Sequence, residues 1–184
     1  MDAPRKLSKI VIPHDEMKPL LIRLAASIVE KVPMEDEPIF LGIKRGGVPL
    51  ARALKEEVQR ITGYEPRLGA LDINLYRDDL GHARKAPKVG PSEIPGSVDD
   101  KVVVLIDDVL HTGRTVRAAI DAIADYGRPS RIYLAVLCDR GGRELPIAAD
   151  FVGREVEVED GLHLAIEFDE AGSIEARLLF YSGQ

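Results

Sequence analysis

The amino-acid sequence predicts an α/β domain in which a mostly parallel sheet is flanked by helices. Short apolar runs alternate with stretches whose apolar residues recur at helical spacing, and this alternation is typical of parallel strands connected by covering helices. No segment repeats, and 184 residues with 45% hydrophobic content suffice for one domain with a full core. We therefore expect residues 1–184 to form a single domain with a core over about residues 15–139.

The first element is predicted to be an amphipathic helix over residues 18–32. Leu20, Leu24 and Ile28 recur at the spacing that places side chains on one helix face, and Pro33 ends the pattern. The remaining elements alternate in type, and the β-branched runs among them indicate strands buried on both faces. They are a strand at 39–43, a helix at 48–61, strands at 67–75 and 101–107, a helix at 115–126 and a strand at 131–139.

Two further segments are less regular. Residues 155–159 alternate acidic and apolar side chains, which predicts a strand with one acidic, solvent-facing side. Residues 78–100 are polar and contain three prolines, and so long a connection is uncommon in a compact domain. We expect a mobile active-site lid there, with a plain surface insertion as the alternative. Arg77, Asp78 and Asp79 open this segment and are candidates for closing contacts.

Residues 102–116 read V-V-V-L-I-D-D-V-L-H-T-G-R-T-V, which predicts a buried strand followed by a helix. Asp107 and Asp108 stand at the carboxyl end of that strand, where parallel sheets bind their ligands. Two adjacent carboxylates repel each other, so hydroxyls, cations or solvent must satisfy them. A ribose diol and a hydrated Mg²⁺ meet that requirement.

The residues after the acid pair are suited to a phosphate group. The backbone N–H groups of residues 110–115 and the hydroxyls of Thr112 and Thr115 lie at the start of a helix, where the dipole favours negative charge. Gly113 permits a close approach that a side chain would block. The alternative is an ordinary strand-to-helix turn in which Asp108 or Thr112 caps the helix.

A second loop, G-I-K-R-G-G-V-P at 42–49, also follows a predicted strand and precedes a helix. Val48 stands where a Walker loop requires lysine, which disfavours a nucleoside triphosphatase. Lys44 and Arg45, with the amides of the two glycines after them, are donors suited to pyrophosphate. A plain glycine-rich turn with solvated basic side chains is the alternative.

Composition limits the other function classes. The net charge of −6 and a pI near 5.3 argue against strong nonspecific nucleic-acid binding but leave room for a local basic face. The four histidines show no zinc-ligand spacing, and the single cysteine, Cys138, lies in an apolar run as a small core residue. The polar N-terminus and the lack of a long apolar stretch predict a cytoplasmic protein without a membrane span.

The string V-V-L-I-D-D-V-L-H-T-G-R-T resembles the phosphoribosyl pyrophosphate (PRPP) binding motif of the type I phosphoribosyltransferases. The resemblance continues through L-D-I-N-L-Y-R-D-D-L at 71–80, G-R-P-S-R-I-Y-L-A-V-L at 127–137 and D-R-G-G-R-E-L-P-I at 139–147. With these segments the chain is similar to the PyrR family over most of residues 15–153. Members of that family pair uracil phosphoribosyltransferase activity with control of pyrimidine genes by binding messenger RNA.

The resemblance implies a type I phosphoribosyltransferase fold with a small C-terminal hood over about residues 140–184. It implies that uracil and PRPP react to UMP and pyrophosphate, with Mg²⁺ bound through PRPP and, via water, to Asp107 and Asp108. The other implied partners are UMP or UTP, a leader hairpin of messenger RNA, and further copies of this chain in a homodimer or homotetramer.

The resemblance also implies roles for individual residues. The PRPP-binding residues are Asp107, Asp108, Val109, Leu110, His111, Thr112, Gly113, Arg114 and Thr115. The pyrophosphate-binding residues are Lys44, Arg45, Gly46 and Gly47, with the arginine one position earlier than in the usual family form. The catalytic residues are Asp107, Asp108, His111 and Arg77, the base-binding residues are Asp139 and Arg140, and the RNA-binding residues are Arg23 and Arg143.

The chain departs from the family pattern near the base. Purine enzymes of this type have Asp between Leu110 and Thr112, and PyrR proteins usually have Tyr, whereas this chain has His111, which disfavours a purine substrate. His111 either exchanges a proton with a base or phosphate or is an exposed loop residue. The acidic segment R-E-V-E-V-E-D-G at 154–161 replaces small polar residues and leaves a phosphoribosyltransferase for another base open.

The chain also departs from the family at the implied RNA contacts. Gly142 and Ala148 replace a His and an Arg, and Ile22 and Ala26 stand where Thr and His are usual. Because a charge-assisted hydrogen bond is worth ~1.5–3 kcal/mol, losing two or three costs several kcal/mol. We therefore predict reduced or altered RNA binding. A UMP- or PRPP-sensing RNA-binding regulator with little catalysis remains the alternative to an enzyme.

Overall fold

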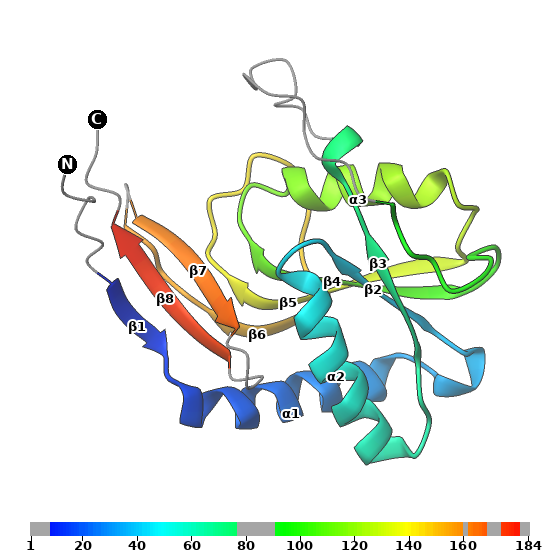
Figure 1. The fold of residues 1–184 in the computed structure, drawn as a ribbon, viewed down its shortest axis with the longest axis horizontal. Coiled ribbons are helices and arrows are strands. Elements are labelled where there is room, and N and C mark those ends of the chain that lie inside the picture. Colours follow the sequence, from blue (N-terminus) through cyan, green and yellow to red (C-terminus); the bar gives the residue numbers. More distant parts are fainter. Residues whose placement is uncertain (1–7, 77–90, 160–161, 169–173, 181–184) are drawn as a thin grey trace.

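A computed structural model of the chain describes residues 8–76, 91–159, 162–168 and 174–180. Its centre is a five-stranded sheet in the order β3-β2-β4-β5-β6, and every neighbouring pair is parallel (Figure 1). The strands are β2 (Ile39–Ile43), β3 (Arg67–Leu71), β4 (Val102–Leu110), β5 (Arg131–Asp139) and β6 (Phe151–Glu155). The predicted parallel α/β fold is therefore confirmed.

Helices cover both faces of this sheet, as Figure 1 shows. They are α1 (His14–Lys31), α2 (Gly47–Thr62) and α3 (Arg114–Ala124), with 3₁₀ turns η1 (Met34–Asp36) and η2 (Asn74–Tyr76). The core residues of α1 and α2 form one cluster, and those of α3 form another on the opposite face. Along β4, Val104 belongs to the first cluster and Val103 to the second, because successive side chains point to opposite faces.

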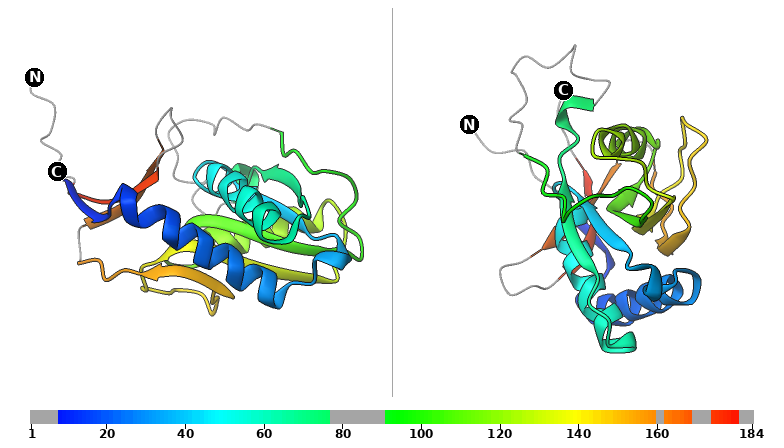
Figure 2. Two further views of the ribbon diagram at one scale, coloured as in Figure 1. Left: turned by 90° about the horizontal axis from the view of Figure 1, so that it is seen from below. Right: turned by 90° about the vertical axis from the view of Figure 1, so that its right-hand side faces the viewer.

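A smaller antiparallel sheet lies at one end of the molecule (Figure 2). Its order is β1-β8-β7, with β1 (Ser8–Ile12), β7 (Leu162–Phe168) and β8 (Ile174–Phe180). The segment predicted as the hood, residues 140–184, is thus divided. Its strand β6 joins the central sheet, whereas β8 pairs with the N-terminal strand β1 and β7 pairs with β8.

The boundaries differ from the predicted ones at several elements. The first helix begins at His14 and contains Pro19, although its apolar stripe is the predicted one. Strand β3 ends at Leu71, so the predicted strand at 67–75 is too long, and η2 follows. The strand predicted at 155–159 is wrong, because β6 ends at Glu155 and the next four residues have no regular structure. Their burial nevertheless alternates as the pattern indicated.

Part of the predicted lid is tied to the domain by hydrogen bonds. Residues 92–95 run beside β3, where Glu93 and Ala70 exchange backbone hydrogen bonds of 2.9 and 2.7 Å. Arg77, Asp78 and Asp79, the predicted closing contacts, lie outside the described residues. No helix among the described parts of the chain is both long and apolar enough to cross a membrane.

Candidate functional site

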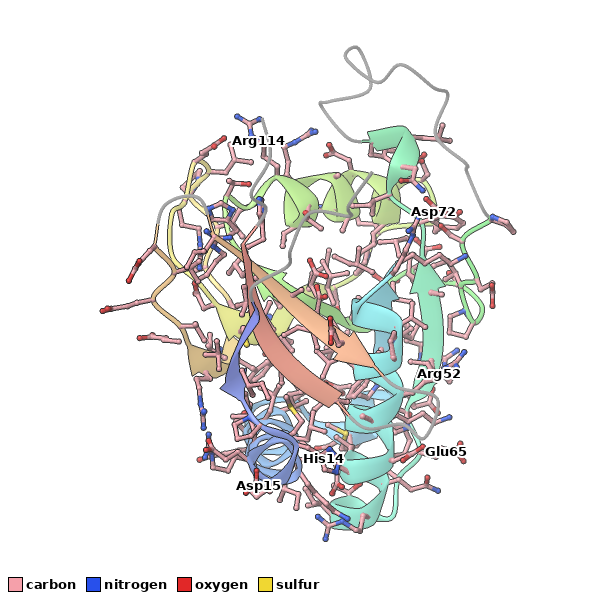
Figure 3. The ribbon with its side chains drawn as sticks, turned by 60° about the vertical axis from the view of Figure 1, so that its left-hand side comes forward. His14, Asp15, Arg52, Glu65, Asp72 and Arg114 are labelled. Carbon is pink, nitrogen blue, oxygen red and sulfur yellow. The ribbon has the colours of Figure 1, made fainter. Side chains whose placement is uncertain are left out.

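The predicted site residues gather at the carboxyl edge of the central sheet. There the register pairs Gly42 with Ile106, Ile43 with Leu71, and Leu110 with Asp139. The loops after β2, β4 and β5 therefore emerge side by side, as expected of a parallel sheet. Figure 3 shows Asp72 and Arg114 toward this end of the molecule and His14 and Asp15 at the opposite end.

The acid pair lies within β4 and not beyond its end, because the strand continues to Leu110. Asp107 is only 5% exposed, and burial together with the nearby charge of Asp108 raises its pKa well above the usual range of an Asp. The Asp107 carboxylate accepts a hydrogen bond from the Asp108 N–H at 3.0 Å, and Asp108 accepts one from the Val109 N–H at 2.9 Å. Both carboxylates are therefore held by the strand's own backbone.

The loop after β2 touches the acid pair. A Cβ atom built on Gly46 would lie 2.0 Å from Oδ2 of Asp108, and one on Gly47 would lie 2.2 Å from the carbonyl oxygen of Ile106. Both distances are far shorter than any contact a side chain allows. The two glycines are therefore what lets the predicted pyrophosphate loop approach the predicted ribose site, a contact that the sequence analysis did not foresee.

Lys44 and Arg45 differ in burial, since Lys44 is half-buried and Arg45 is exposed. The peptide bond between them is cis. Lys44 donates its backbone N–H to the Leu71 carbonyl at 2.9 Å and its ammonium to the Pro91 carbonyl at 2.7 Å. The same ammonium lies 3.8 Å from the Glu93 carboxylate. Lys44 thus joins the loop after β2 to residues 91–93.

The loop after β4 leads directly into α3. Gly113 precedes the helix with φ of 91°, a left-handed conformation that glycine adopts at low cost. The Thr112 hydroxyl accepts a hydrogen bond from the Arg114 N–H at 3.3 Å. Helix α3 therefore begins at Arg114, and its first backbone N–H groups lie at the place predicted for a phosphate.

His111 is exposed, and its ring lies over Gly142, where a Cβ atom would come within 2.8 Å of Nε2. Partial burial and the positive charge of Arg140 lower the pKa of His111, so its imidazole is neutral at pH 7. A neutral imidazole has one donor and one acceptor nitrogen. Both predicted roles of His111, proton exchange and a simple loop position, remain predictions.

A cavity of about 660 Å³ lies beside the loop after β5. Its lining residues are Asp139, Arg140, Gly141, Arg143, Glu155, Val156 and Glu157. The Asp139 carboxylate accepts hydrogen bonds from the Gly141 N–H at 2.9 Å and from the Arg143 guanidinium. Nε of Arg140 is buried and has no hydrogen-bond partner within the described residues. The two predicted base-binding residues thus border one cavity.

The two predicted RNA-binding residues lie on different elements. Arg23 is exposed on α1 and donates a long hydrogen bond of 3.4 Å to the Gly153 carbonyl. Arg143 lies in the loop after β5, and its guanidinium is bonded to groups within the chain.

Sequence reasoning overlooked Asp72, which is 9% exposed at the end of β3 on the same sheet edge. Its backbone N–H donates to the Ser92 hydroxyl and its carboxylate accepts from the Asn74 N–H, both at 2.9 Å. A polar residue that directly follows a buried strand was the available signal. Across the described ranges, no group of three or more His, Cys, Asp or Glu side chains is placed to hold a metal ion on its own.

Known proteins resemble this chain in sequence and in fold. A family described as the phosphoribosyl transferase domain matches residues 11–166. The bifunctional protein PyrR of Geobacter sulfurreducens is 49% identical over 163 residues, which cover 88% of this chain and 92% of that protein. The bifunctional protein PyrR of Geobacter sp. strain M21 is 48% identical over 161 residues, covering 87% and 90%.

Solved structures show the same fold at low sequence identity. A hypoxanthine phosphoribosyltransferase of Trypanosoma cruzi superposes with a TM-score of 0.66 at 15% identity, over 91% of this chain and 95% of the other. One from Staphylococcus aureus has a TM-score of 0.60 at 17% identity, over 82% and 79%. The domain match, the PyrR relatives and the fold agree, and the chain belongs to the PyrR family of phosphoribosyltransferases.

Proposed function

We propose that this protein transfers the phosphoribosyl group of PRPP to uracil, giving UMP and pyrophosphate. The contact between Gly46 and the Asp108 carboxylate carries this proposal. It joins a basic, glycine-rich loop to a pair of acids that is followed by a helix N-terminus. A substrate with a diphosphate, a ribose diol and a phosphate matches these three parts in turn.

Each part of PRPP has proposed partners on the sheet edge. The N–H groups of Thr112, Gly113 and Arg114, with the hydroxyls of Thr112 and Thr115, bind the 5′-phosphate. Val109, Leu110 and His111 complete that segment. Asp107 and Asp108 accept hydrogen bonds from the ribose hydroxyls, and Lys44, Arg45, Gly46 and Gly47 donate to pyrophosphate.

The acid pair also fits Mg²⁺, which accompanies PRPP in this proposal. Carboxylate oxygens are suited to this hard cation, and no described Lys or Arg forms an ion pair with Asp107 or Asp108. Since the described residues cluster too few ligands to hold the ion alone, we expect it to be bound mainly through PRPP, with water between it and the acids. The ion would offset negative charge on the departing pyrophosphate.

In the reaction, N1 of uracil forms a bond to C1 of the ribose while the bond from C1 to the pyrophosphate oxygen breaks. Pyrophosphate leaves with that electron pair, and the N1 proton is released to a base. Positive charge develops at C1, and donors from the loop after β2 stabilise the leaving group. His111 is the proposed acceptor of a proton near the base, since its lowered pKa keeps the imidazole neutral. Arg77 remains a predicted closing contact.

The cavity beside the loop after β5 is the proposed base site, bordered by Asp139 and Arg140. The proposed hood covers about residues 140–184, which include β7 and β8, next to a core of about residues 15–139. We further propose a cytoplasmic homodimer or homotetramer, as the family resemblance implies.

A second function, binding of a leader hairpin of messenger RNA under control of UMP or UTP, is favoured by relatives named bifunctional protein PyrR. The exposed Arg23 on α1 is the proposed contact. Because Gly142, Ala148, Ile22 and Ala26 replace the polar and basic residues discussed above, we expect this binding to be reduced or altered.

The proposed activity is tested by measuring pyrophosphate release from PRPP and Mg²⁺ with uracil, hypoxanthine, guanine, xanthine or orotate. We expect turnover with uracil alone. Turnover with a different base would overturn the proposed specificity. An absence of turnover with every base, combined with binding of UMP, would favour the nucleotide-sensing regulator.

A further inference from the structure

The loop after β5 contacts the segment of residues 111–115, which we call the phosphate loop. We propose that Arg143 is the positioning residue that fixes the phosphate loop for PRPP. This inference rests on the proposed function, and it assigns Arg143 to the interior of the site instead of to an RNA partner.

The Arg143 guanidinium forms four hydrogen bonds within the chain. Nη1 donates to the carbonyl of His111 at 2.7 Å and to that of Gly141 at 3.2 Å. Nε donates to the carbonyl of Ile147 at 2.9 Å, and Nη2 donates to the Asp139 carboxylate. One side chain therefore connects the start of the phosphate loop, the end of β5 and both sides of its own loop.

Only a guanidinium satisfies this arrangement. Its N–H groups form a rigid planar fork, so three nitrogens reach acceptors in different directions at once. A lysine at this position supplies a single nitrogen and can replace only part of the set. The Arg143 side chain is 25% exposed and its ion-pair partner Asp139 is 18% exposed, so solvent screens their attraction less than at an open surface.

Other contacts transmit the position of Arg143 to the phosphate loop. The N–H groups of Glu144 and Leu145 both donate to the Thr112 carbonyl at 3.0 Å. The Glu144 carboxylate also accepts a hydrogen bond of 2.6 Å from Arg114. A Cβ atom on Gly113 would lie 3.3 Å from Ile147 and 3.4 Å from Leu145. The two loops are thus packed together, and a shift of one displaces the other.

Displacement of the phosphate loop affects binding of PRPP more than binding of the base. The loop offers backbone N–H groups in a fixed geometry, and a misplacement of about 1 Å in such a site can cost ~100-fold. Loss of the Arg143 bonds is therefore expected to raise the KM for PRPP by ~10-fold or more, with a smaller effect on the KM for uracil.

The test compares Arg143→Gln and Arg143→Lys with Arg60→Gln as the matched control. Arg60 lies on α2, where its guanidinium pairs with the neighbouring Glu57. We expect Arg143→Gln to raise the KM for PRPP, Arg143→Lys to recover part of the loss, and Arg60→Gln to match the unmodified protein. Amide hydrogen exchange should also quicken by ~10-fold at residues 111–114 in Arg143→Gln, while exchange in α2 stays unchanged.

The proposed function and the proposed role of Arg143 can fail separately. If the unmodified protein does not turn over uracil, the proposed function fails, and calorimetric binding of UMP together with amide exchange still tests Arg143. Unchanged exchange at residues 111–114 in Arg143→Gln, with PRPP and UMP binding within twofold of the unmodified protein, would overturn the positioning role. Loss of RNA affinity alone in that variant would instead assign Arg143 to a partner.

Discussion

At the scale of single residues, Asp107 is a carboxyl group that the fold buries at a cost to stability. Its pKa is raised first by burial and then by the charge of Asp108, so the folded protein retains a proton that an unfolded chain releases above pH ~4. Because the folded state then binds more protons, stability falls as pH rises from there toward the raised pKa. Burial of Asp107 therefore lowers the free energy of unfolding at neutral pH, as expected of a group that serves the proposed PRPP site and not folding.

Replacing Asp107 with Asn tests this link. We expect Asp107→Asn to lose activity and to become more stable relative to the unmodified protein as pH rises from 4 to 8, since the amide cannot ionise. Urea unfolding midpoints across that range measure the difference. Asp36→Asn, at an exposed position in η1, is the control and should follow the unmodified protein. If the urea midpoints of Asp107→Asn and of the unmodified protein changed in parallel with pH, the account would be contradicted.

Gly46 offers a second test at this scale. A methyl group there would displace the Asp108 carboxylate, so we expect Gly46→Ala to reduce kcat/KM for PRPP by ~100-fold. Gly63→Ala is the matched control. Gly63 is the C-cap of α2, where a Cβ atom meets open space but the φ of 75° is left-handed. That variant should lose ~1 kcal/mol of unfolding free energy and retain activity. Normal activity in Gly46→Ala would show that the loop after β2 need not approach Asp108 so closely.

At the scale of elements, apolar patterns predicted strands and helices well where burial determines them. Strands β2 and β5 match their predicted bounds, because both are continuous apolar runs in the middle of the sheet. The pattern at 155–159 predicted alternating burial correctly and a strand wrongly. Val156 donates its N–H to the Asp139 carbonyl at 2.8 Å, but β5 ends at Asp139, so its ladder with β6 stops there. Pairing between distant segments, such as β1 with β8, leaves no local signal at all.

The predicted apolar stripe of the first helix is also testable. Leu24 is 2% exposed in the core beneath α1, so we expect Leu24→Ala to lower the unfolding free energy by ~2–5 kcal/mol. Ala26→Ser, at an exposed position of the same helix, should change it by less than ~0.5 kcal/mol. Chemical denaturation of the two variants measures both values. Similar losses of unfolding free energy in both variants would contradict the assignment of Leu24 to the buried face of α1.

At the scale of the whole molecule, the sequence predicted the segments of the candidate site but not how they contact one another. Asp107, Asp108 and the loop at 44–47 were identified from residue types at the ends of strands. The approach of Gly46 to Asp108 and the internal bonds of Arg143 depend on neighbouring strands that are far apart in sequence. Pattern reasoning treats each segment alone and could not foresee these contacts. The family resemblance implied that Arg143 binds RNA, and that role remains a prediction.

Net charge is also a property of the whole molecule, and it bears on RNA. With a charge of −6 and few basic residues on α1, the protein gains little from counterion release on binding RNA. We expect a pyrimidine-operon leader hairpin to bind more weakly than nanomolar at physiological salt, in a filter-binding assay with and without UMP. Nanomolar affinity under those conditions would contradict the expected reduction.

The central claim is that the acid pair of β4 and the loop after β2 form one PRPP site. UMP formation from uracil, PRPP and Mg²⁺ by the unmodified protein and by an Asp107→Asn/Asp108→Asn double variant tests this claim most directly. The account predicts turnover in the unmodified protein and a loss of at least ~100-fold in the double variant, which should remain folded by circular dichroism. Equal turnover in the two proteins would contradict it.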